Sequence, residues 1–118
     1  MVDVNELALV DVVQIFCIGR KNVTVSLRYS CGEVILVVAD GNVIDAHYKN
    51  LRGKQAFFRA IAIDQAHPKR LQVTDLKKIP VRTIFEPWKK LIFHGLKKQG
   101  FGVLWEDFFP NYPNEVSP

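Results

Sequence analysis

The chain has 118 residues, 48% of them hydrophobic and 24% charged, which excludes a disordered protein and suits one domain with an apolar core. Its longest apolar run, Val34 to Ala39, is too short to cross a bilayer, and residues 1–9 do not resemble a secretory signal, so we expect a cytoplasmic protein without a membrane span. The net charge of +4 is uneven, because residues 77–98 carry seven basic side chains and one acid, whereas residues 101–118 carry three acids and no Lys or Arg.

The first half of the chain predicts one helix followed by three strands. Apolar residues recur at helical spacing over Leu9–Ile18, and Gly19 ends the helix. Residues 23–29 alternate between apolar and polar, as a half-buried strand does. Residues 33–39 form a continuous apolar run typical of a central strand, and the turn at 40–42 leads into a third strand over residues 43–47. We therefore expect three consecutive antiparallel strands.

The second half predicts two further helices separated by a short strand. Residues 53–66 have a broad apolar face and stop at Pro68, and a strand follows over residues 69–74. A third helix should begin between Thr83 and Pro87, where the residues 83–86 fit a capping box, and end near Gly100. The expected fold class is α+β, with an antiparallel β-meander of three to four strands packed against about three helices. This domain covers residues 1–100, and residues 101–118 form an aromatic-rich tail.

Several short motifs follow one another along this predicted order of elements. They are Leu9-x-x-Val12-Val13-Gln14-x-Phe16, Gly32-x-x-x-Leu36-x-x-x-Asp40-Gly41-x-Val43-x-x-Ala46, Gly53-x-x-Ala56-Phe57, and Thr83-Ile84 before the last helix. In this order they resemble the PATAN domain, a bacterial signalling accessory domain. The chain departs from the family at Asn22-Val23, where a Thr/Ser-Gly pair is usual, at His67-Pro68-Lys69, where a glycine turn is usual, and in its aromatic tail.

The resemblance implies a function in signal transduction. PATAN domains occur alone or fused to response-regulator receiver domains, are linked to motility and cell polarity, and bind proteins without established catalytic residues. It therefore implies a non-enzymatic adaptor whose partner is a response regulator, a small GTPase or a motility component. A second copy of the chain is a further candidate partner.

The residues themselves do not predict a catalytic, metal or cofactor site. The three histidines are far apart in sequence and form no ligand spacing with either cysteine. Cys17 lies in or beside the apolar stripe of the first helix, where a cysteine usually serves as a small hydrophobic residue. The turn at residues 40–42 lacks the alternating acids of a calcium loop. We expect neither enzymatic activity nor a cofactor.

The third helix offers the clearest candidate surface for a partner. On a helical wheel the residues expected to face the core are Ile84, Phe85, Trp88, Leu91, Ile92 and Leu96, and Phe93 falls among the lysines of the opposite face. Phe93 is therefore either covered by the folded-back tail or is an anchor for a partner protein. The predicted partner-binding residues are Lys89, Lys90, Phe93 and Lys97 on the helix and Trp105, Phe108 and Phe109 in the tail.

Two alternative functions use other features of the sequence. The lysines of the third helix could follow the phosphates of a nucleic acid, although we do not expect this partner because few arginines lie nearby and no reader motif is present. A pocket between the sheet and the helices could hold a small ligand, although no convergent set of polar residues is readable.

Overall fold

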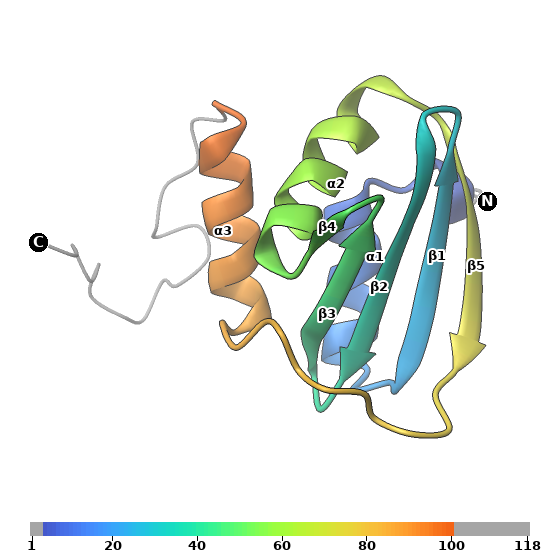
Figure 1. Ribbon diagram of the computed structural model, residues 1–118, viewed down its shortest axis with the longest axis vertical. Coiled ribbons are helices and arrows are strands. Elements are labelled where there is room, and N and C mark those ends of the chain that lie inside the picture. Colours follow the sequence, from blue (N-terminus) through green and yellow to red (C-terminus); the bar gives the residue numbers. More distant parts are fainter. Residues whose placement is uncertain (1–3, 101–118) are drawn as a thin grey trace, which may run out of the picture.

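An antiparallel sheet with helices on one face makes up the described part of the chain, residues 4–100 of a computed structural model (Figure 1). The strand order is β4-β3-β2-β1-β5. The elements are a 3-10 turn η1 (Val4–Glu6), α1 (Leu9–Ile18), β1 (Val23–Tyr29), β2 (Gly32–Ala39), β3 (Asn42–Tyr48), β4 (Leu51–Arg52), α2 (Lys54–Ala66), β5 (Lys69–Asp75) and α3 (Trp88–Lys98). The predicted α+β class with a β-meander is confirmed.

The central strands pair as their apolar pattern predicts. Alternate residues of β1 are buried, and β1 pairs with β2 so that Val25 lies opposite Leu36 on the helix-covered face. The β2–β3 turn has Asp40 at φ 55° and Gly41 at φ 77°, the left-handed conformations that Asp and Gly tolerate. The register between β2 and β3 then shifts between Val37 and Val38, as in a β-bulge.

The two edges of the sheet are only partly foreseen by the sequence. β5 follows α2 as predicted and pairs with β1, which places it at one edge. The two-residue strand β4 at the other edge is not predicted, because a turn separates it from β3 by only two residues and it has no periodicity to recognise.

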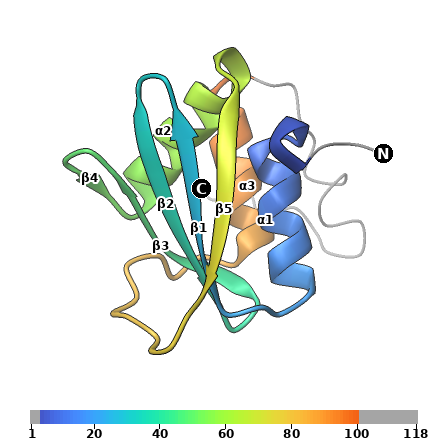
Figure 2. The same cartoon turned by 90° about the vertical axis from the view of Figure 1, so that its right-hand side faces the viewer.

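Helices α1 and α2 cover one face of the sheet, and α3 packs against both of them (Figure 2). They bury an apolar stripe each, with Val13 on α1, Phe57 on α2 and Leu91 on α3 at or below 1% exposure. Gly95 allows α3 to approach α2, since a Cβ there would lie 3.1 Å from Phe58 Cδ1 and still closer to Ile61 Cδ1. None of the helices within residues 4–100 is long and apolar enough to cross a membrane.

A buried ion pair joins α1, α2 and the sheet. Asp64 on α2 binds Lys69 on β5 at 2.9 Å, and their side chains are 9% and 5% exposed. The same carboxylate accepts hydrogen bonds from the Leu9 N–H at 2.7 Å and from Tyr29 Oη at 2.7 Å. Burial and the neighbouring Asp64 raise the pKa of Tyr29, so its hydroxyl remains a donor. The N-cap residue of α1, Ala8, makes no side-chain cap, so Asp64 accepts the hydrogen bond from the Leu9 N–H in the first turn instead.

The start of the third helix differs from the prediction. α3 begins at Trp88 with Pro87 as its N-cap residue, so the capping box predicted at residues 83–86 is wrong. Thr83 instead binds a strand carboxylate, and Glu86 binds Lys54 and His94. Phe85, which lies before the helix and not on its apolar face, is 73% exposed, so its predicted core position is also wrong. Tertiary contacts, not local capping, determine this boundary.

Candidate functional site

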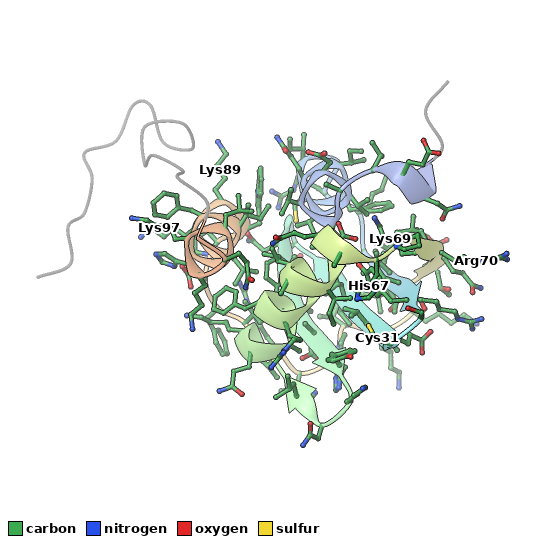
Figure 3. The ribbon with its side chains drawn as sticks, turned by 90° about the horizontal axis from the view of Figure 1, so that it is seen from above. Cys31, His67, Lys69, Arg70, Lys89 and Lys97 are labelled. Atoms are coloured by element: carbon green, nitrogen blue, oxygen red, sulfur yellow. The ribbon has the colours of Figure 1, made fainter. Side chains whose placement is uncertain are left out.

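The predicted lysine surface on α3 is present on the outside of the domain. Lys89 and Lys97 are exposed and Lys90 is partly buried. Lys89 and Lys97 extend away from the body of the protein in different directions (Figure 3). The helix therefore presents separated charges and not a single cationic cluster.

Phe93 does not have the exposure that an open binding anchor requires. Of the two alternatives for this ring, covered or open to a partner, its 7% exposure does not support the open one. Its ring nevertheless lies beside Lys97, as the wheel predicted. The three tail members of the predicted surface, Trp105, Phe108 and Phe109, lie outside the described residues, and so does the predicted covering of Phe93 by the tail.

The lysines of α3 also contact aromatic rings on the protein itself. The ammonium groups of Lys89 and Lys97 lie 5.7 Å from the Trp88 ring and 5.5 Å from the Phe93 ring, respectively, and Lys98 lies 5.3 Å from the Phe58 ring. Such cation–π contacts stabilise each lysine at its own ring. They distribute the positive charge along the helix.

A second cluster of ionisable groups, which the sequence did not predict, lies on the face of the sheet that the helices leave open. Asp45 on β3 is 2% exposed. Its carboxylate lies 3.0 Å from His47 Nε2 and accepts a hydrogen bond from Arg52 Nη2 at 3.2 Å. It also accepts hydrogen bonds from Thr83 Oγ1 at 2.5 Å and from the Ala46 N–H at 2.9 Å. Four separate groups thus surround one carboxylate.

The environment of Asp45 favours its ionised form. Burial raises the pKa of the carboxyl group, but the hydrogen bonds from Thr83 and Arg52 and the charges of His47 and Arg52 outweigh burial and hold it below its ordinary value. An ionised carboxylate with its acceptor positions occupied orients its neighbours instead of transferring a proton. The cluster is therefore a fixed support for the groups around it.

A shallow hollow of about 510 Å³ lies beside this cluster. Its lining comes from the open face of all four strands of the meander and from the chain after β5: Thr24, Ile35, Val37, Asp45, His47, Arg52, Leu76, Lys78 and Pro80. The floor is mainly aliphatic, and Arg52 and His47 keep 53% and 44% of their side chains exposed. The hollow thus combines an apolar floor with the cationic side chains of Arg52 and Lys78.

The segment between β5 and α3, residues 76–87, borders the hollow and carries exposed apolar side chains. Ile79, Val81 and Phe85 are 55%, 79% and 73% exposed. The segment runs along one end of the sheet and extends to the side opposite α1 (Figure 2). The N–H groups of Thr83 and Ile84 donate to the Ile44 carbonyl at 2.8 and 3.0 Å, which fixes the segment to β3.

The described residues offer little for nucleophilic or metal chemistry. Cys17 is buried in the core, and burial raises the pKa of its thiol to about 12, so the reactive thiolate is scarce near neutral pH. Within residues 4–100 no group of three His, Cys, Asp or Glu side chains is placed to hold a metal ion.

Part of the missed cluster has a signal in the sequence. Asp45 and His47 are two residues apart in a predicted strand, so they share a face. Arg52 returns to lie opposite His47 through the two-residue turn at residues 49–50, which has no predicted element. Thr83 lies 38 residues after Asp45, and the contact between them depends on how the whole chain crosses the sheet. No local pattern could have found it.

No protein-family model, curated protein or solved structure matches this chain. The resemblance to the PATAN domain therefore rests on the motifs in the sequence, and the role of the site rests on its own geometry.

Proposed function

We propose that this chain is a non-enzymatic adaptor domain that binds another protein in bacterial signal transduction, as its resemblance to the PATAN domain implies. The observation that carries the proposal is the exposure of Ile79, Val81 and Phe85 on one segment that is hydrogen-bonded to the sheet. The cytoplasmic location expected from the sequence is part of the same proposal.

Exposed apolar side chains on a fixed segment favour association with another protein. Burying apolar surface contributes about 25 cal/mol per Å², and a fixed segment loses less conformational entropy on binding than a mobile one does. Arg82 lies between the exposed Val81 and Phe85, and aromatic residues and arginine are enriched in protein interfaces. The segment therefore has the composition of a contact surface.

The candidate partners are a response regulator, a small GTPase and a motility component. Binding of the full chain to purified receiver-domain and GTPase proteins of its own organism can be measured by biolayer interferometry. The proposal expects one of them to bind, and it expects the double substitution Val81→Ser with Phe85→Ser to weaken that binding about tenfold or more through lost apolar contact. Ile15→Ser is a matched control, because Ile15 is 56% exposed on α1, away from this segment. If Ile15→Ser weakened binding as much as the double substitution, this segment would not be the contact surface.

A nucleic-acid partner is tested with the same protein. Phosphate binding by the lysines would give affinity for generic duplex DNA that falls steeply with salt. The proposal expects no such binding, because the ammonium groups of Lys89, Lys97 and Lys98 are distributed over separate rings. Tight, salt-dependent binding of duplex DNA would show that the function is nucleic-acid binding and not that of an adaptor.

A further inference from the structure

The open face of the sheet has an ordered arrangement of side chains across its strands. One row runs from Ser26 through Ile35 to His47, and the next runs from Thr24 through Val37 to Asp45. Small hydroxyl residues therefore lie on β1, aliphatic residues on β2 and ionisable residues on β3. The floor of the hollow is the aliphatic strip in the middle.

The charges around this strip are mainly positive. Asp45 is buried and bound by Arg52, and Glu33 is bound by Arg28 at 3.3 Å, so each acid of this face is already compensated by an arginine. The exposed part of Arg52, together with Lys78 and the adjacent Lys77, is left facing the solvent beside the hollow. A ligand that enters the hollow therefore meets an apolar floor and a positive border.

The geometry points to an acidic peptide segment of the partner protein as the occupant of this hollow. We propose that one bulky apolar side chain of that peptide rests on the partly exposed Ile35, while its carboxylates pair with Lys78 and Arg52. This inference rests on the proposed adaptor function and names the chemistry of the partner. Charge complementarity is the argument for the acidic character, and the aliphatic floor is the argument for the apolar side chain.

The shape and lining of the hollow favour a peptide over the other occupants. Its side chains are borne on an open sheet face and on the adjoining segment, so it can admit an extended chain that continues along residues 76–87. Its lining residues include no Phe, Tyr or Trp, and their one aromatic ring, the imidazole of His47, is bound to Asp45. Its polar groups are few, and Asp45 is already occupied, which leaves little to orient a small polar ligand.

Contacts beneath the hollow hold the side chains at its border in place. Asp45 holds Arg52 and His47 on the sheet and also binds Thr83 of the bordering segment. Leu76, at the other end of that segment, packs against Val37, Ala39 and Ile44, and its N–H donates to the Asn22 carbonyl at 3.0 Å. The floor and the border are therefore joined by the same contacts.

The test uses the full chain and two labelled synthetic peptides in fluorescence anisotropy. Both peptides carry the same Leu and Phe residues, flanked by Glu in one and by Gln in the other. We expect the Glu peptide to bind more tightly than the Gln peptide by about tenfold, as expected for loss of two rim charge pairs. Lys78→Glu should remove that preference. Lys98→Glu is the matched control, an exposed lysine on α3, and should leave it unchanged.

Several results would overturn the inference. They are equal binding of the two peptides, equal effects of Lys78→Glu and Lys98→Glu, and displacement of the Glu peptide by generic duplex DNA. Tighter binding by a peptide of residues 101–118 at the same site would assign the hollow to the chain's own tail and not to a partner. A partner that depends on Val81 and Phe85 but is insensitive to Lys78→Glu would leave the adaptor function intact and remove only the acidic-peptide site.

Discussion

The Thr83 hydroxyl donates a hydrogen bond of 2.5 Å to the buried carboxylate of Asp45, which joins the segment before α3 to the open face of the sheet. Because the backbone N–H of Thr83 also donates to Ile44, both the side chain and the backbone of one residue fix this segment to β3. The exposed positions of Ile79, Val81 and Phe85 on this segment therefore depend on the contact.

Thr83→Val should therefore destabilise the protein and loosen this segment. The substitution keeps the side-chain shape but removes a hydrogen bond to a buried charge, which costs about 2 kcal/mol. Urea unfolding measures the loss, and hydrogen exchange at the Ile84 amide should become faster. Thr74→Val, at an exposed position on β5, is the control and should change the stability by less than about 0.5 kcal/mol. An unchanged Ile84 exchange rate in Thr83→Val would show that the backbone bonds alone fix the segment.

The Asp64–Lys69 pair should behave as a buried ion pair does. Asp64→Asn leaves the Lys69 ammonium in a site where its side chain is 5% exposed, so we expect a loss of about 3–5 kcal/mol. Lys69→Met should cost a similar amount by leaving the carboxylate unpaired. The double variant should be more stable than the sum of the two losses predicts, because neither charge is then left alone.

The measurement is a double-mutant cycle by urea unfolding. Glu33→Gln is the comparison, because Glu33 forms an exposed pair with Arg28, and its loss should be below about 1 kcal/mol. Additive losses at Asp64 and Lys69 would mean that the two charges do not depend on each other.

The sequence predicts the layers of the fold well because its apolar residues keep strict periods. The alternation in β1 and the helical stripes of α1 and α2 each identify one buried face, and these faces meet in one core. The turn at Asp40 and Gly41 fixes the order of β2 and β3. These are local signals, and they survive in the folded chain.

The sequence predicts the candidate site poorly because the site is made by tertiary contacts. The residues proposed from the helical wheel share one helix, whereas the hollow takes its lining from β1, β2, β3, β4 and the chain after β5. Phe85 shows the same limit, because the wheel placed it in the core and the structure leaves it 73% exposed. Phe93 lies beside Lys97 as the wheel predicted, but its low exposure could not be read from the helix alone. A wheel cannot show where a helix begins or what packs beside it.

The difference in exposure between Phe85 and Phe93 gives a direct stability prediction. Phe93→Ala should lower the free energy of unfolding by about 3 kcal/mol, because it removes a side chain that is 7% exposed and leaves a cavity. Phe85→Ala is the matched control, since Phe85 is 73% exposed, and it should change stability by less than about 0.5 kcal/mol. Thermal or urea unfolding of the two variants compares them. Equal stability of both would mean that Phe93 is not buried in solution.

The two cysteines should differ in their reaction with iodoacetamide. Cys17 is 2% exposed and its thiol has a pKa raised to about 12, whereas Cys31 is partly exposed in the turn between β1 and β2. Native protein at pH 8 should therefore be alkylated at Cys31, with Cys17 modified only as fast as the protein unfolds. Peptide mass spectrometry after timed labelling gives both rates, and labelling in urea is the control in which both should react. Fast labelling of native Cys17 would contradict its burial.

The stability of the protein in acid should depend on Asp45. The pKa of its carboxyl group is held below the ordinary value of 3.8, so the unfolded chain binds a proton at a higher pH than the folded chain does. The contribution of the ionised carboxylate is therefore complete above the unfolded value and is lost as the pH falls through the folded value. Asp45→Asn cannot titrate at this position, so the stability difference between the native sequence and this variant should shrink as the pH falls below about 5. Urea midpoints measured at intervals between about pH 2.5 and 7 provide the comparison, and a difference that stays constant throughout this range would show that the pKa of Asp45 is not lowered by folding.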